Sequence, residues 1–166
     1  NYFWDLLEGV PGLKAHRVKE DAENNMAGWY APHGIYKADE LGGLSDTRFT
    51  EAVRAEGVGE CYPGCNAALH THELFNTCDV YGHGKPTRIA NASRDVRELD
   101  KSLPISEKIG SIIYWIPWFK KFYPEIIEEY ANAYKKVAEN YEELLEGDSG
   151  NPPKLGGWHF FKHTED

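Results

Sequence analysis

The most regular pattern of apolar and polar positions lies near the C-terminal end of the chain. Apolar side chains recur there at positions 126, 127, 130, 131, 134, 137, 138, 141, 144 and 145. This spacing forms one continuous face at the helical period. Pro124 suits the first position of a helix, and Gly147 suits the residue that ends it. We therefore expect a long amphipathic helix between these two residues.

Two further helical segments are expected. In "SDTRFTEAVRAEG", Ser45 or Asp46 suits the N-cap and Gly57 the end, with an inner face at positions 49, 52, 53 and 55. Residues 1–7 are typical of the last turns of a helix, because their apolar positions fall at helical spacing before Gly9 and Pro11.

Three short stretches predict strands, over residues 12–18, 27–37 and 109–116. Pro32 and Gly34 predict a break in the second, and Pro117 ends the third. Strands mixed with helices predict a small two-layer α+β domain. We expect a short, mainly antiparallel sheet with helices on one face and the long amphipathic helix at the C-terminal end.

Composition narrows the possible partners and compartment. The chain has 166 residues and a formal net charge of -9, which argues against nucleic acid or an anionic membrane as a partner. Apolar residues make up 41%, enough for a packed core, in which we expect the aromatic side chains of Trp29, Tyr30, Trp115 and Trp118. Only three cysteines are present, which favours reduced thiols in the cytoplasm over a secreted disulfide scaffold.

The stretch "GECYPGCNAALHTHELFNTC", residues 59–78, holds all three cysteines and two histidines. One interpretation is a zinc site, because thiolates and imidazoles are zinc ligands. Its ligands would come from Cys61, Cys65, His70, His72 and Cys78. The other interpretation is a substrate-facing loop with Tyr62, Asn66, His70 and His72 at its rim. The cysteine and histidine spacing is not that of a standard zinc knuckle, which favours the second.

Four stretches together resemble one enzyme family. They are "NYFWDLLEGVPGLK", "GWYAPHGIYKADELGGLSDTRFTEAVRAEGV", "GCNAALHTHELF" and "LPISEKIGSIIYWIPWFKKFYPEIIEEYANAYKKV". In this order they resemble the small C-terminal domain of the DegT-type sugar aminotransferases, which are fold-type I enzymes dependent on pyridoxal phosphate. The resemblance covers residues 1–137. It implies that residues 1–146 form this small domain, that residues 1–9 end the interdomain helix, and that residues 147–166 form a C-terminal tail.

The resemblance also implies an activity that this chain does not carry alone. The family transfers an amino group, usually from glutamate or glutamine, to a keto-sugar or keto-cyclitol, and some relatives are dehydratases instead. A lysine that forms an imine with pyridoxal phosphate lies in the large N-terminal domain, in a motif of the form S-x-H-x-x-K that is absent here. The chain alone is therefore expected to be non-catalytic. The whole enzyme is expected to be a homodimer.

Five residues are expected on the substrate side of such an enzyme. Asn66 and His70 would donate or accept hydrogen bonds with the substrate, Tyr62 and His72 would line the same mouth, and Arg88 would bind a carboxylate with its planar guanidinium. Each also has a structural interpretation, as a turn former, a satisfied buried histidine or a surface ion pair. The alternative function from a different class is a self-standing Cys/His metal-binding or interaction module.

Overall fold

The computed structural model describes residues 1–18, 23, 30–65, 67–79, 82, 93 and 102–151. The chain divides into two compact units. The first unit comprises Asn1–Gly64 and Ser111–Pro152, and the second comprises Cys65–Gly110 and Pro153–Asp166.

A three-stranded antiparallel sheet lies at the centre of the first unit. Its strands are β1 (Leu13–Lys14), β2 (His33–Tyr36) and β3 (Ile113–Trp115), in the order β1-β2-β3. Leu13 pairs with Tyr36 across the first strand pair, and Gly34 pairs with Tyr114 across the second. The expected short antiparallel sheet is confirmed.

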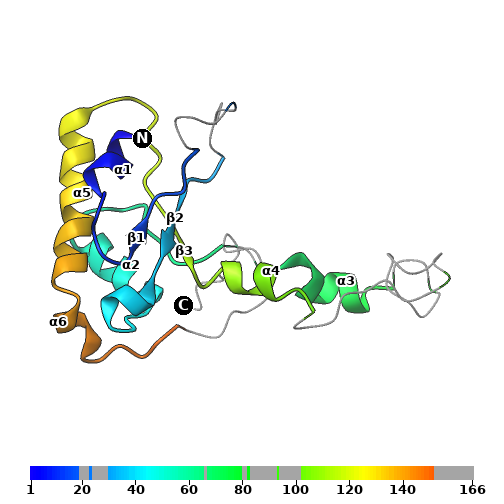
Figure 1. Ribbon diagram of the computed structural model, residues 1–166. Coiled ribbons are helices and arrows are strands. Elements are labelled where there is room, and N and C mark those ends of the chain that lie inside the picture. The colour runs from blue at the N-terminus through cyan, green and yellow to red at the C-terminus, as the bar shows by residue number, and fades with distance from the viewer. Residues whose placement is uncertain are drawn as a thin grey trace, which may run out of the picture. The chain divides into compact units, whose positions relative to one another are not determined.

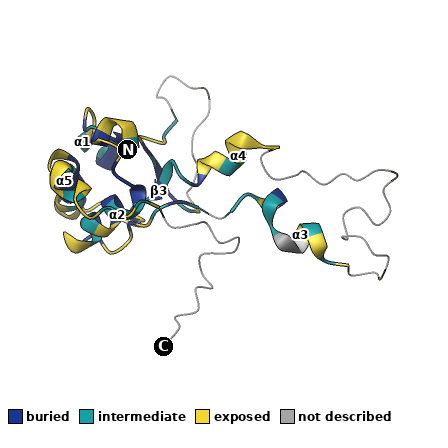
Figure 2. Ribbon diagram, turned by 90° about the horizontal axis from the view of Figure 1, so that it is seen from below, coloured by how far each residue is buried: buried dark blue, intermediate teal, exposed yellow. Residues whose placement is uncertain are grey.

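Helices cover one side of this sheet. The first unit contains α1 (Tyr2–Leu6), the 3-10 helix η1 (Ala38–Leu41), α2 (Asp46–Ala55), α5 (Pro124–Glu139) and α6 (Glu142–Leu145). Figures 1 and 2 show α1, α2 and α5 together on the same side of the strands. The predicted α+β architecture with a long C-terminal helix is therefore confirmed. The described helices of the second unit are η2 (Leu69–Thr71), α3 (Glu73–Thr77) and α4 (Pro104–Ile109).

Four buried aromatic side chains join the sheet to the helices. Phe49 of α2 packs against Tyr36 of β2, Tyr114 of β3 and Tyr134 of α5, at ring-centroid distances of 5.2, 6.1 and 6.2 Å. We call these four residues the aromatic cluster. Each aromatic pair contributes about 0.5–1.5 kcal/mol beyond its buried area. Because each ring comes from a different element, the cluster fixes α2, β2, β3 and α5 relative to one another.

Main-chain acceptors satisfy two of the three tyrosine hydroxyls of the aromatic cluster, and the buried hydroxyl of Tyr114 has no hydrogen-bond partner among the described residues. The hydroxyl of Tyr36 donates to the carbonyl oxygen of Leu44 at 3.0 Å, and that of Tyr134 donates to Trp115 O at 3.4 Å. Burial raises the pKa of Tyr36 and of Tyr134 well above the ordinary value, so both stay neutral donors.

Two expectations about the strands were wrong. The third strand begins at Ile113 rather than Ile109, because Pro104 starts helix α4, which includes Ile109. Gly34 lies inside β2 rather than at a break. A Cβ there would lie 2.6 Å from Cη2 of Trp4 and closer still to the ring of Tyr114, so only glycine allows these two rings to approach.

The C-terminal helix and the aromatic residues also differ in part from expectation. The helix that begins at Pro124 ends at Glu139, and a separate short helix, α6, follows. Ile126 in α5 and Leu145 in α6 are exposed. Tyr30 and Trp118 were expected in the core but are 84% and 47% exposed.

Residues 148–151 fasten the C-terminal end of the first unit to the start of α2. Ser45 caps this helix by accepting a hydrogen bond from Arg48 N at 3.1 Å, as expected. Asp148 in turn accepts from Ser45 N and Oγ at 2.8 and 2.7 Å, and Asn151 Oδ1 accepts from Thr47 N and Oγ1. We call residues 148–151 the C-terminal clasp. A carboxylate at this position also suits the positive end of the helix dipole.

Gly34→Ala tests the close packing within the sheet. We expect a loss of about 1–3 kcal/mol in the free energy of unfolding, because the added methyl group forces Tyr114 or Trp4 to move. Gly59→Ala is the matched control, because a Cβ at Gly59 meets no atom within 4 Å. Urea unfolding followed by tryptophan fluorescence measures both. Equal stability of the two variants would contradict the packing argument.

Asp148→Asn tests the C-terminal clasp. Partial burial favours the protonated acid, but hydrogen bonds from Ser45 and Gly150 outweigh it and lower the pKa of Asp148. The carboxylate therefore stabilises the fold above its unfolded pKa of about 3.9 and loses that effect as the pH falls through the lower folded value. We expect Asp148→Asn to cost about 0.5–2 kcal/mol at pH 7 and progressively less as the pH falls below about 3.9. Asp39→Asn, at an exposed position, is the control; a pH-independent difference from wild type would contradict the electrostatic part.

Candidate functional site

Residues 62–64 extend the sheet of the first unit along the free side of β3. Pro63 forms an isolated antiparallel bridge with Tyr114. On either side of it, Trp115 N donates to Tyr62 O and Gly64 N donates to Ile113 O, both at 2.8 Å. This pairing fixes the backbone from which the side chain of Tyr62 projects.

Arg54 of α2 orients that side chain. One guanidinium nitrogen, Nη1, donates to the carbonyl oxygen of Cys61, and the guanidinium carbon lies 4.9 Å from the centroid of the Tyr62 ring. Such a cation–π contact contributes about 0.5–1 kcal/mol at an exposed site. The side chain of Tyr62 remains 51% exposed, so its outer face is accessible to a ligand.

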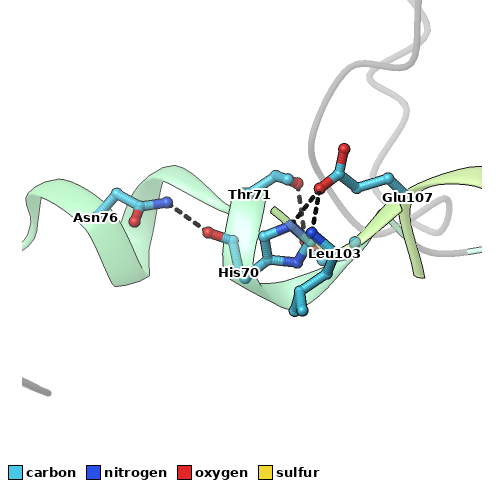
Figure 3. Close-up of polar contacts among 6 residues, drawn as sticks. His70, Thr71, Asn76, Leu103 and Glu107 are labelled. Atoms are coloured by element: carbon cyan, nitrogen blue, oxygen red, sulfur yellow. Dashed lines mark hydrogen bonds and ion pairs between the residues drawn. The ribbon is translucent and has the colours of Figure 1, made fainter. Parts of the chain in front are cut away.

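His70 occupies the centre of a polar cluster in the second unit, shown in Figure 3. It lies in η2, and its side chain is only 6% exposed. Its Nε2 atom lies 2.8 Å from Oε1 of Glu107 in α4. A buried imidazole without a partner would cost about 1–3 kcal/mol, so this contact is what makes the burial of His70 tolerable.

The same carboxylate oxygen also holds the start of α4. Leu103, the N-cap residue, donates its backbone N–H to Glu107 Oε1 at 3.1 Å, as Figure 3 also shows. A carboxylate that reaches back to the N-cap amide resembles half of a capping box. Glu107 thus links η2 to α4. The two residues in contact, His70 and Glu107, are 37 positions apart in the sequence.

Asn76 of α3 makes hydrogen bonds to the backbone of the segment that carries His70 and His72. Its Nδ2 donates to the carbonyl oxygens of His70 and His72, at 2.8 and 3.0 Å. Thr71 Oγ1 donates to Ala68 O at 2.8 Å. The ring of His72 is partly exposed and makes an edge contact with Phe75 at a centroid distance of 6.0 Å.

The five residues expected on the substrate side fall in different parts of the structure. His70 and His72 share one turn of the second unit, whereas Tyr62 belongs to the first unit. Asn66 and Arg88 lie outside the described residues. Sequence reasoning missed Glu107, Asn76 and Arg54. The available signal for Glu107 was its place in the first turn after Pro104, which is where a carboxylate suits a helix start.

The cysteines of the Gly59–Cys78 stretch have unequal environments. Cys61 is fully buried beside the aromatic cluster, and burial raises the pKa of its thiol to about 12. Cys65 and Cys78 are partly exposed, and none of the three, all within the described residues, forms a disulfide. Within the described ranges, no group of three or more His, Cys, Asp or Glu side chains is arranged to hold a metal ion.

The described residues do not provide a site for pyridoxal phosphate. That cofactor needs a lysine inside a pocket and a cradle of donors for its phosphate. None of the lysines that the structure describes is buried. A groove of about 460 Å³ between α2 and α5 does contain Lys136, but Nζ of this residue is paired with both carboxylate oxygens of Glu56, at 2.8 and 2.7 Å.

No family model matches the sequence, and neither does any curated protein. Among the described helices, none has both the length and the apolar character needed to cross a membrane.

Thiol labelling tests the unequal cysteine environments. With a disulfide reagent at pH 8, we expect Cys65 and Cys78 to react in the folded chain and Cys61 to react only after unfolding, because burial and its raised pKa suppress the thiolate. Time-resolved absorbance counts the reacted thiols. The variant Cys61→Ala should keep both rapidly reacting thiols and lose the one that appears in denaturant. Rapid reaction of all three in the folded protein would contradict this assignment.

Proposed function

We propose that the chain is the C-terminal, substrate-side domain of a pyridoxal-phosphate-dependent aminotransferase. The complete enzyme would transfer an amino group from glutamate or glutamine to a keto-sugar or keto-cyclitol. It would act in the cytoplasm as a homodimer. The lysine and most cofactor contacts would come from a large N-terminal domain of the same polypeptide.

The observation that carries this proposal is the agreement between the four resembling stretches and the elements of the fold. The first stretch contains α1 and β1, and the second contains β2, η1 and α2. The third contains η2 and the start of α3, and the fourth contains α4, β3 and most of α5. Each stretch therefore spans at least one complete helix or strand, although the third ends inside α3 and the fourth inside α5. This correspondence supports a resemblance that extends over a complete small domain.

The chemistry of the candidate residues supports a role in substrate recognition. Sugars and cyclitols carry many hydroxyl groups, and a protein selects among them with oriented hydrogen-bond donors and acceptors. Tyr62 presents a phenol from a segment paired with β3, and His72 presents an imidazole from a turn held by side-chain contacts. The proposal assigns substrate binding to Tyr62, His72, Asn66 and Arg88, and to His70 the role of supporting His72.

The proposal assigns the chemistry to the large domain and the choice of substrate to this one.

An activity assay on the complete polypeptide that contains this chain tests the proposal. With pyridoxal phosphate and a panel of keto-sugars and keto-cyclitols, we expect 2-oxoglutarate to form from glutamate only when an acceptor is present. The 166-residue chain alone is the control. It should show no activity, and no stoichiometric lysine adduct after borohydride reduction with pyridoxal phosphate.

Two outcomes would contradict the proposal. A single stoichiometric lysine adduct on the chain alone would place the cofactor lysine here. Loss of water from the sugar without any amino transfer by the complete polypeptide would indicate a dehydratase relative instead.

A further inference from the structure

The described part of the second unit lacks an apolar interior. Among its side chains that the structure describes, His70 alone is buried, and Leu69, Phe75, Leu103, Ile105 and Ile109 are all exposed. We call residues 68–77 the His70 turn. The contacts that the structure describes for this turn are mainly polar, and segments held in this way open more readily than a packed core.

Glu107 and Asn76 make polar contacts with the ring and the backbone of the His70 turn, in addition to the hydrogen bond from Thr71 Oγ1 to Ala68 O. Glu107 accepts from the backbone amide of Leu103 and pairs with Nε2 of His70, so the imidazole is anchored to the first turn of α4. Asn76 donates one amide group to two carbonyl oxygens of the turn, at His70 and His72. Glu107 therefore constrains the turn from a different helix, and Asn76 constrains it from within residues 68–77.

The burial of His70 makes direct contact between its ring and a ligand unfavourable. Its side chain is 6% exposed, and Nε2 is occupied by the carboxylate of Glu107. A residue in that position acts on a ligand through the backbone that it holds rather than by direct contact. His72, two residues further along, keeps a partly exposed ring from a backbone that Asn76 fixes at its carbonyl oxygen.

We propose that Glu107 and Asn76 are positioning residues for substrate binding. They hold the His70 turn in the one conformation that places His72 against the hydroxyl groups of a keto-sugar or keto-cyclitol. This inference rests on the proposed function for its substrate, but its structural part stands on the contacts of this chain alone.

Hydrogen exchange of the 166-residue chain, read by mass spectrometry, tests the structural part. In Glu107→Ala, His70 loses its partner and Leu103 its acceptor, so we expect amides in residues 69–77 to exchange at least about tenfold faster. In Glu107→Gln, the amide oxygen still accepts from both groups, so exchange should stay within about threefold of wild type. Asn76→Ala should accelerate the same residues.

The matched control for the exchange experiment lies in the first unit. Glu56→Gln removes a carboxylate from the exposed pair with Lys136 and should leave the exchange of residues 69–77 unchanged. Unchanged exchange of these residues in both Glu107→Ala and Asn76→Ala would overturn the proposal.

Steady-state kinetics of the complete polypeptide test the substrate part. We expect Glu107→Ala to raise KM for the keto substrate about tenfold with kcat little changed, because a misplaced binding group weakens ground-state and transition-state binding alike. Glu107→Gln should restore most of the affinity, and Glu56→Gln should match wild type.

The two experiments separate failure of this inference from failure of the proposed function. Faster exchange with unchanged KM and kcat would show a purely structural role and overturn the positioning claim. A wild-type polypeptide without aminotransferase activity would overturn the proposed function and, with it, the substrate assigned to the turn. The exchange data would then still decide whether Glu107 and Asn76 hold the turn.

Discussion

The packing of Phe49 against three tyrosines is the interaction on which the first unit depends. Each ring belongs to a different element, so removing one would release a helix or a strand from the others. The position of Tyr114 in β3 requires glycine at position 34 of the neighbouring strand. Tyr114 also forms a backbone bridge with Pro63. The position of the aromatic cluster therefore helps to fix the backbone next to Tyr62.

The two units achieve order by different means. The first has an apolar core, and long-range hydrogen bonds of the C-terminal clasp join its chain end to α2. In the described part of the second, the buried side chain is a histidine held by a carboxylate. Segments with few buried apolar contacts open more readily than a core does, and binding loops are often drawn from them. The contacts that the structure describes in the second unit are thus mainly polar and centre on His70.

Sequence patterns predicted the elements that depend on local signals. The helical period before Gly147, Pro124 at the start of α5 and Ser45 as the cap of α2 all act within a few residues. The strands were harder to predict, because two to four residues are too few to show an alternating pattern. Ile109 was assigned to a strand because it begins the apolar stretch that continues to Ile116, whereas it is the last residue of helix α4.

Contacts in the candidate site and in the C-terminal clasp join residues far apart in the sequence. In the candidate site Glu107 contacts His70 across 37 positions, and in the clasp Asp148 contacts Ser45 across 103. No periodic pattern encodes such a pairing, so the sequence indicated His70 as a candidate without indicating its partner. Gly34 shows the converse case, since a residue typical of a break is required by two rings that only the folded chain brings to it.

We propose that this chain supplies the substrate side of an enzyme whose chemistry lies in another domain. Reconstitution in trans examines this proposal, with the proposed large domain and this chain produced separately and then mixed. We expect no amino transfer by either piece alone and pyridoxal-phosphate-dependent transfer to the keto substrate by the mixture. Full activity of the large domain alone, with the same KM as the complete polypeptide, would contradict the proposal.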